Sequence, residues 1–276
     1  MLCFPNAKIN LGLNIIERRP DNFHNIATVF CPISLSDILE IIRTENNPNK
    51  VELKITGMQI SGDSESNLCV KAYHLLDKEF DLPPITIYLH KLVPMGAGFG
   101  GGSSNGAFTL TLLNQLFELG LADDQLAGYA EQLGSDCAFF IHNKPAFGTG
   151  KGNVLTDIQL DLSGKYLVLV KPDIFISTAE AYAGVKPVKL TQSIPELLEH
   201  PITDWKQLVI NDFEESIFLR HPEIKIIKND LYKRGALYAS MTGSGSAVFG
   251  IFDDEVKLKT TFPGMFYWGG WLKMKL

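Results

Sequence analysis

The feature that most constrains the fold of this chain is a run of glycines that leads directly into an apolar helical pattern. It reads PMGAGFGGGSSN over residues 94–105, and five of the seven residues from Gly96 to Gly102 are glycines. Backbone without Cβ atoms can approach a ligand closely, and successive N–H groups can then surround an anion. A helix expected from Ser103 onward adds unpaired N–H groups and the positive end of its dipole. The run therefore predicts a phosphate-binding loop.

Two better-known phosphate motifs fit this run poorly. The P-loop pattern G-x-x-x-x-G-K-[ST] is absent. The letters G-x-G-x-x-G do occur from Gly96 to Gly101. A dinucleotide-binding fold, however, requires a strand after the helix that ends in an acidic residue about 20 positions on. Asp123 has that spacing but opens a further helix, so an oxidoreductase of this type is disfavoured.

Hydrophobic patterns predict strands and helices that mix without a regular alternation. Strands are expected at 3–16, 26–42, 51–55, 85–93, 166–171, 236–241 and 246–252. Helices are expected behind an N-cap at Ser66, at 103–117, from Asp123 or Asp124 to Gly134, after Thr178, and near 205–210 and 222–233. This order favours an α+β fold over a doubly wound parallel sheet. The glycine-rich FGTGKG at 147–152 predicts a boundary between domains 1–152 and 153–276.

Composition excludes several classes of protein. With 276 residues, 45% of them hydrophobic and 20% charged, the chain can build an ordinary core. A net charge of -6 without a basic run argues against a nucleic-acid partner. The four cysteines lack C-x-x-C spacing, which predicts reduced thiols, and no window approaches the about 18 apolar residues of a membrane span. We therefore expect a cytoplasmic protein with a small-molecule substrate, no membrane association and no required protein partner.

The glycine-rich run and three other segments resemble the GHMP kinases. These segments are AKINLGL (7–13) with DNFHNI (21–26), GSDCAFF (134–140) and MTGSGSAVFGIF (241–252). Weaker matches at SNLCVKAYHLL (66–76) and NDFEE (211–215) extend the likeness over nearly the whole chain. The long loop form PMGAGFGGGSSNGA is most similar to the branch of the family that acts on a methylerythritol carrying a cytidine diphosphate group.

The resemblance implies a two-domain fold with a ribosomal protein S5 domain 2-like N-terminal domain and a ferredoxin-like C-terminal domain. It places the active site in the cleft between them. It also implies ATP with Mg²⁺ as phosphoryl donor and transfer of the γ-phosphoryl to the 2-hydroxyl of the methylerythritol unit, a step in non-mevalonate isoprenoid precursor biosynthesis. Three alternatives stay open: a mevalonate-type kinase, a homoserine-type kinase, and an inactive nucleotide sensor on the same fold.

Two residues are expected to carry the chemistry. Lys8 lies in an otherwise apolar strand, and Asp136 lies between a helix end and an apolar run. Singly, each has an ordinary explanation, as an edge lysine and as a helix cap. As a pair, the carboxylate would take or orient the proton of the acceptor hydroxyl, and the lysine would keep the carboxylate ionised. Phosphoryl transfer depends more on positioning and charge neutralisation than on a strong base. Retention of both residues argues against a sensor.

The remaining assignments follow from the resemblance. Nucleotide-binding residues are expected to be Asn67, Lys91, Pro94, Gly96, Gly98, Gly100, Gly101, Gly102, Ser103 and Ser104. Acceptor-binding residues are expected to be Asn10, Phe23, His24, Thr178, Tyr182, Gly243 and Gly245. His24 would recognise the cytosine and Tyr182 would stack on it. Phe23 stands where related sequences often have Tyr, so a phenolic hydrogen bond would be missing. No metal ligand is predicted.

Overall fold

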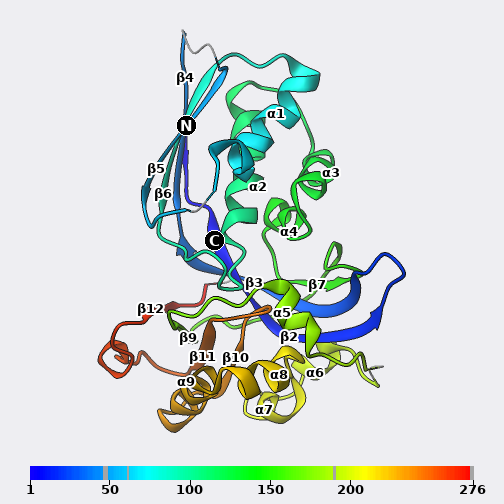
Figure 1. Cartoon of the computed structure of the whole chain (residues 1–276), viewed down its shortest axis with the longest axis vertical. Helices are drawn as coiled ribbons and strands as arrows, with labels where there is room; N and C mark the ends of the chain where they lie inside the picture. Colours follow the sequence, from blue (N-terminus) through cyan, green and yellow to red (C-terminus); the bar gives the residue numbers. More distant parts are fainter. Residues whose placement is uncertain (46–48, 61, 189–190, 274–276) are drawn as a thin grey trace. The chain divides into compact units, whose positions relative to one another are not determined.

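A computed structural model describes residues 1–45, 49–60, 62–188 and 191–273, and the chain forms two compact units (Figure 1). Unit 1 comprises Met1–Ala7, Leu35–Met95 and Gly100–Lys144. Unit 2 comprises Lys8–Ser34, Gly96–Phe99 and Pro145–Leu276. Each unit combines sheet and helices, so the α+β prediction is confirmed. The predicted division after residue 152 cuts the chain once, whereas these units alternate along it.

Unit 1 contains a sheet covered on one face by helices (Figure 1). The strand order is β1 (Leu2–Cys3), β4 (Ile38–Arg43), β6 (Ile85–Lys91) and β5 (Val51–Gly57). Strand β5 runs parallel to β6, and the other neighbours are antiparallel. The helices are α1 (Leu68–Phe80), α2 (Gly101–Leu116), α3 (Asp123–Leu133) and α4 (Cys137–His142).

Helix α1 shows how local sequence sets an element of unit 1. Asn67 caps its N-terminus, because its side chain accepts a hydrogen bond from the N–H of Cys69 at 2.9 Å. The cap was expected one position earlier, at Ser66, which instead closes the 3₁₀ turn Ser64–Ser66. Asp81 ends the helix in the left-handed region, and two prolines follow.

Unit 2 contains two further sheets. The first has the order β2 (Asn6–Arg18), β3 (His24–Ser36), β7 (Ala146–Thr149) and β8 (Val154–Asp157). The second is antiparallel, with the order β10 (Tyr238–Met241), β11 (Val248–Phe252), β9 (Tyr166–Lys171) and β12 (Phe266–Trp271). The helices are α5 (Thr178–Ala183), α6 (Ile194–Leu198), α7 (Trp205–Leu208), α8 (Phe213–Arg220) and α9 (Pro222–Lys233).

The core of unit 2 joins distant parts of the sequence. Leu13, Ile15 and Ile26 from the first sheet belong to one buried cluster with side chains of the second sheet and of helices α8 and α9. The carboxylate of Asp212 accepts a hydrogen bond from the backbone N–H of Ile15 at 2.8 Å. The early strands are therefore part of the same core as the second half of the chain.

Several elements differ from the sequence-based expectation. The apolar run 26–42 is two strands rather than one, because the fully buried Asp37 separates β3 from β4, which belong to different sheets. Helix α2 begins at Gly101, inside the glycine run, two positions earlier than expected. The short elements α4, α6, α8, β1, β7, β8 and β12 were not predicted. Their apolar stretches are too brief for a periodic pattern.

Candidate functional site

In unit 2, the glycine-rich loop packs against the turn between β10 and β11. Gly98 has a φ of +80°, and a Cβ atom there would lie 2.0 Å from the carbonyl oxygen of Thr242. The hydroxyl of Thr242 donates to the carbonyl oxygen of Gly98 at 3.2 Å. Only glycine combines this backbone conformation with so close an approach. The predicted Gly98 and the TGSG turn at 242–245 are therefore brought together.

Lys8 and Asn10 lie beside this contact, and both are buried. The backbone N–H of Lys8 donates to the carbonyl of Phe99 at 3.0 Å, and its Nζ donates to Oδ1 of Asn10 at 2.6 Å. The backbone N–H of Asn10 donates to the hydroxyl of Thr242 at 3.1 Å. A Cβ on Gly243 would lie 3.4 Å from Oδ1 of Asn10. Unit 2 thus gathers four predicted site residues, Lys8, Asn10, Gly98 and Gly243, around Thr242.

In unit 1, the start of α2 is formed by glycines. Gly100 is the N-cap, with φ +70° and no side-chain capping bond. A Cβ on Gly101 would lie 2.9 Å from the Nζ atom of Lys91, so this turn is free of side-chain bulk. The Oγ of Ser104 is fully buried and has no hydrogen-bond partner among the described residues. A buried hydroxyl of this kind fits a phosphate oxygen or an ion bound to it.

A pocket of about 150 Å³ opens beside the same turn of α2. Its walls include the apolar side chains of Leu68 and Met95, and Asn67 and Asn105 supply amide groups. Ile60, Asp63, Ser66 and Gly102 complete the lining. Apolar walls with a few polar groups suit a flat heteroaromatic ring. The predicted nucleotide residues Asn67 and Gly102 meet here.

A buried ion pair forms hydrogen bonds with Asn105, one of the residues that line this pocket. Lys91 and Asp37 are both fully buried and form a hydrogen-bonded salt bridge. Asn105 donates to Asp37 at 2.9 Å and accepts from Lys91 at 3.2 Å. Burial lowers the pKa of Lys91, against the opposing effect of Asp37. The side chain of Lys91 is therefore committed to the interior of unit 1, and a contact with adenine stays a prediction.

The residues expected to bind the acceptor base form a ring stack in unit 2. The rings of His24 and Tyr182 lie 4.6 Å apart at 19°. Tyr182 also contacts Phe213 edge-on, with ring centroids 4.9 Å apart. The pKa of His24 is lowered, mainly by burial and secondarily by Arg18. The two residues chosen from sequence therefore contact each other face to face, and that they bind a base stays a prediction.

Four other predicted residues lie at separate points. Asp136 precedes α4 in unit 1 and is its N-terminal flanking residue. Thr178 is the exposed first residue of α5. Phe23 is 57% exposed, and the ammonium of Lys151 lies 3.9 Å from its ring centroid. Gly245 has a φ of +97° and ends the TGSG turn. That Asp136 acts together with Lys8 stays a prediction.

The remaining predicted loop residues follow the course of the chain. Pro94 is buried, Gly96 is exposed beside the ring of Phe175, and Ser103 lies in the first turn of α2.

Within the described residues, no group of three or more His, Cys, Asp or Glu side chains is placed to hold a metal ion. No helix in the described ranges is both long and apolar enough to cross a membrane.

Sequence reasoning missed three residues that build the site. Asp37 interrupts an apolar run, which was a usable signal for a buried charge. Asn105 directly follows Ser104 in α2, and no sequence pattern relates it to Asp37 or Lys91. Thr242 begins the TGSG turn, of which only Gly243 and Gly245 were predicted site residues, and no local pattern indicates that its hydroxyl bonds Gly98 and Asn10.

Two family models match the chain. The GHMP kinases N terminal domain matches residues 67–144, and the GHMP kinases C terminal domain matches residues 190–260. The chain is 53% identical over 267 residues to a 4-diphosphocytidyl-2-C-methyl-D-erythritol kinase of Bacteroides fragilis, covering 96% of this chain and 97% of that protein. A 54% identical relative from Bacteroides thetaiotaomicron bears the same name, with 95% of both chains covered.

Solved structures agree with these matches. A crystal structure of 4-(cytidine 5'-diphospho)-2C-methyl-D-erythritol kinase superposes with a TM-score of 0.77 at 30% identity, covering 91% of this chain and 90% of that one. The mevalonate kinase of Methanococcus jannaschii has a TM-score of 0.73 at 16% identity, covering 99% and 98%. The second likeness shows the fold alone.

Proposed function

The chain belongs to the GHMP kinases, among the 4-diphosphocytidyl-2-C-methyl-D-erythritol kinases, and on that premise we propose that it phosphorylates 4-diphosphocytidyl-2-C-methyl-D-erythritol. The phosphoryl group comes from ATP and goes to the 2-hydroxyl of the methylerythritol unit. The observation that carries this proposal is the packing of Lys8, Asn10 and Thr242 around Gly98 of the glycine-rich loop.

The nucleotide is assigned to the start of α2 and the adjoining pocket. The amide group of Asn67 would orient the base between Leu68 and Met95. Backbone N–H groups of the loop and of the first helical turn would bind the phosphates, and the orphaned hydroxyl of Ser104 fits the same role. Mg²⁺, when bound on the phosphates, neutralises charge that develops during transfer.

The chemical step is assigned to Asp136 and Lys8. The oxygen of the 2-hydroxyl forms a bond to the γ-phosphorus while the bond from that phosphorus to the β–γ bridging oxygen breaks. Asp136 takes the hydroxyl proton, and Lys8 stabilises the negative charge on the acceptor oxygen. Asn10 holds the ammonium of Lys8 in a fixed direction through their 2.6 Å hydrogen bond.

The acceptor's cytosine is assigned to the stack of His24 and Tyr182. In this scheme the imidazole bonds the polar edge of the base, and the phenol ring covers its face. A lowered pKa keeps His24 neutral at pH 7, so one ring nitrogen can accept and the other can donate.

We also assign the protein to the cytoplasm, because all four cysteines are free thiols.

An acceptor panel tests the function. ATP consumption is measured with 4-diphosphocytidyl-2-C-methyl-D-erythritol, its uridine analogue, mevalonate and homoserine. We expect turnover with the cytidyl acceptor, weaker turnover with the uridine analogue and background rates with the other two. Equal turnover of an acceptor that lacks the cytidyl group would remove the substrate assignment and leave a kinase of the wider family. No turnover of any alcohol would favour the sensor.

A further inference from the structure

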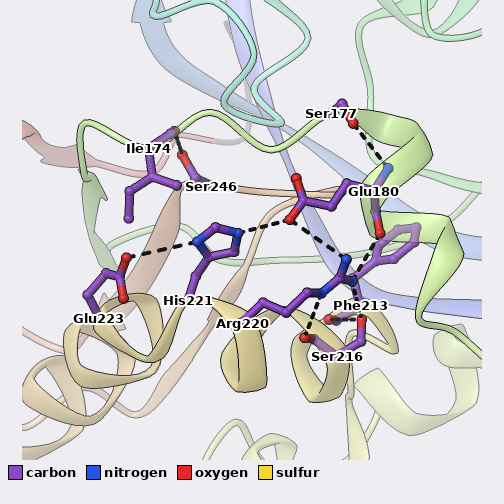
Figure 2. A network of polar contacts seen from close by, with 9 residues as sticks. All are labelled: Ile174, Ser177, Glu180, Phe213, Ser216, Arg220, His221, Glu223 and Ser246. Atoms are coloured by element: carbon purple, nitrogen blue, oxygen red, sulfur yellow. Dashed lines mark hydrogen bonds and ion pairs between the residues drawn. The ribbon is translucent and has the colours of Figure 1, made fainter.

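A polar network joins α5 to the end of α8. Figure 2 shows Glu180 of α5 reaching His221 and Arg220 at the end of α8. The carboxylate of Glu180 lies 2.9 Å from Nε2 of His221 and 3.7 Å from a guanidinium nitrogen of Arg220. The pKa of Glu180 is lowered, mainly by the hydrogen bond with His221, and the guanidinium of Arg220 also lowers it.

Arg220 connects the two helices through backbone as well as side chains. One guanidinium nitrogen donates to the carbonyl oxygen of Glu180 at 3.0 Å. The Nε atom donates to the carbonyl oxygen of Ser216 at 3.3 Å. An arginine whose planar group bonds both helices limits how they can rotate against each other.

Helix α5 needs such support because it has only six residues. A helix of that length is not stable by itself in water. Its N-terminus is capped by Ser177, whose hydroxyl accepts from the N–H of Glu180 at 3.1 Å. At its other end, a Cβ on Gly184 would lie 2.4 Å from the Cβ of Ser216, so α5 and α8 approach closely there.

The two ends of α8 contact α5 in different ways. Phe213, its first residue, packs edge-on against Tyr182, and Arg220, its last residue, bonds Glu180. Tyr182 and Glu180 are two positions apart, which places them on roughly opposite sides of α5. The polar network therefore sets the rotation of α5, and that rotation sets the plane of the Tyr182 ring.

We propose that Glu180, Arg220 and His221 form a clamp that positions Tyr182 to receive the base of the acceptor. They are positioning residues, and they touch neither acceptor nor nucleotide. The proposal rests on the proposed function, because it gives the stacked ring a ligand. It assigns acceptor affinity to charges on the far side of the helix that carries the ring.

The test compares Glu180→Gln with the parent enzyme. We expect the KM for the cytidyl acceptor to rise about tenfold, which corresponds to about 1.4 kcal/mol of lost positioning. The values of kcat and of KM for ATP should change by less than about twofold, because the interactions of the chemical step are untouched. Glu215→Gln is the matched control: the same change on the exposed surface of α8 should leave all three values unchanged.

A double-mutant cycle separates positioning from general stability. If Glu180 acts through the ring, the loss in Glu180→Gln disappears once Tyr182→Ala is present. Calorimetric titration with cytidine 5′-diphosphate should show the same pattern without turnover. Arg220→Ala should raise the acceptor KM, and Arg220→Lys should restore part of the affinity, since a lysine keeps the positive charge but lacks the planar group that bonds both helices.

Each outcome decides the proposal. An unchanged acceptor KM in Glu180→Gln overturns it, and so does a loss that is equally large in the Tyr182→Ala background. A parallel fall in kcat and in ATP affinity also overturns it, because that indicates general damage. A parent enzyme that neither phosphorylates the cytidyl acceptor nor binds cytidine 5′-diphosphate overturns the proposed function first, and the clamp with it.

Discussion

Lys8 is 3% exposed in β2, where a charged side chain is costly unless it is hydrogen-bonded or paired. Its sequence context, an apolar strand interrupted by Lys and Asn at alternate positions, already indicated a polar site on one face. The partners of Asn10 could not be predicted in this way. Thr28 and Thr242 are distant in sequence, and only the fold places their hydroxyls beside Asn10.

Asp136→Asn tests the catalytic assignment by removing one negative charge. The amide keeps the shape of the side chain but accepts no proton, so kcat should fall by a factor on the order of 10²–10⁴. Lys8→Met should have a similar effect through lost charge stabilisation. Binding of a non-hydrolysable ATP analogue, measured by calorimetry, should be nearly unchanged in Asp136→Asn. The control is Asp123→Asn, at the exposed start of α3. Near-normal turnover of Asp136→Asn would refute its role.

The ring stack makes a second prediction at single positions. Loss of a stacking ring costs about 1–3 kcal/mol. The acceptor KM of Tyr182→Ala should therefore rise roughly tenfold to a hundredfold, and the KM for ATP should not move. His24→Ala should act comparably and should also lose discrimination between cytosine and uracil acceptors. Steady-state kinetics with both acceptors measures this. A His24→Ala enzyme that still prefers cytosine would show that another group reads the base.

At the scale of elements, helices with strong stripes and caps were predicted well and short pieces were not. The stripe in α1 and the glycine after α3 located both helices to within one or two residues. Asp37 explains one failure. Its carboxylate accepts from the backbone N–H groups of Leu92 and Val93, so it breaks one predicted strand and ends another two residues early. Such an effect comes from tertiary structure and leaves no periodic pattern.

Gly98→Ala tests the fit between the loop and the TGSG turn. The new methyl group would lie 2.0 Å from the carbonyl oxygen of Thr242, at a φ that side chains rarely adopt, so the loop must move. We expect ATP-analogue affinity to fall at least about tenfold, since a displacement of about 1 Å in a site can cost up to about a hundredfold. Gly128→Ala in α3 meets no atom within 4 Å and should stabilise the protein by about 0.5–1 kcal/mol. Equal ATP affinity in both variants would contradict the assigned loop.

The buried ion pair predicts a large loss of stability when one charge is removed. Asp37→Asn leaves Lys91 buried without a counter-charge, so the free energy of unfolding should fall by about 3–5 kcal/mol. Adding Lys91→Met should recover part of this loss, because the unpaired charge is then gone. Urea unfolding of the single and double variants measures both effects. As a control, Asp253→Asn breaks an exposed pair with Lys165 and should cost less than about 1 kcal/mol. A double variant less stable than Asp37→Asn would contradict this account.

On the scale of the whole molecule, the sequence predicted the class of fold and the family, but not the alternating course of the chain. The glycine-rich interval at 147–152 lies near the crossing between Lys144 and Pro145. The earlier crossings occur inside β2, inside β3 and inside the glycine loop, where strand and loop patterns continue without a break. Composition carries no signal at such points, because the strand pattern or the glycine-rich pattern continues through each crossing.

The alternation of the chain between the two units predicts that residues 153–276 will not fold when expressed alone. The fragment lacks Leu13, Ile15 and Ile26, which are part of the unit 2 core, and Asp212 would lose its bond to Ile15. Circular dichroism and denaturant titration should show no cooperative transition. Mixing in a second fragment, residues 1–152, should restore one. Cooperative unfolding of the isolated 153–276 fragment would show that the core is complete without the early strands.

The same alternation has a consequence for biosynthesis. The ribosome releases Ile15 long before Asp212, 197 positions later, and Asn10 must wait 232 positions for Thr242. At about 5–20 residues per second, the apolar faces of β2 and β3 stay without their partners for roughly 10–40 seconds. Lower growth temperatures and co-expressed chaperones should therefore raise the yield of native enzyme, because the first strands that are made are among the last to be buried.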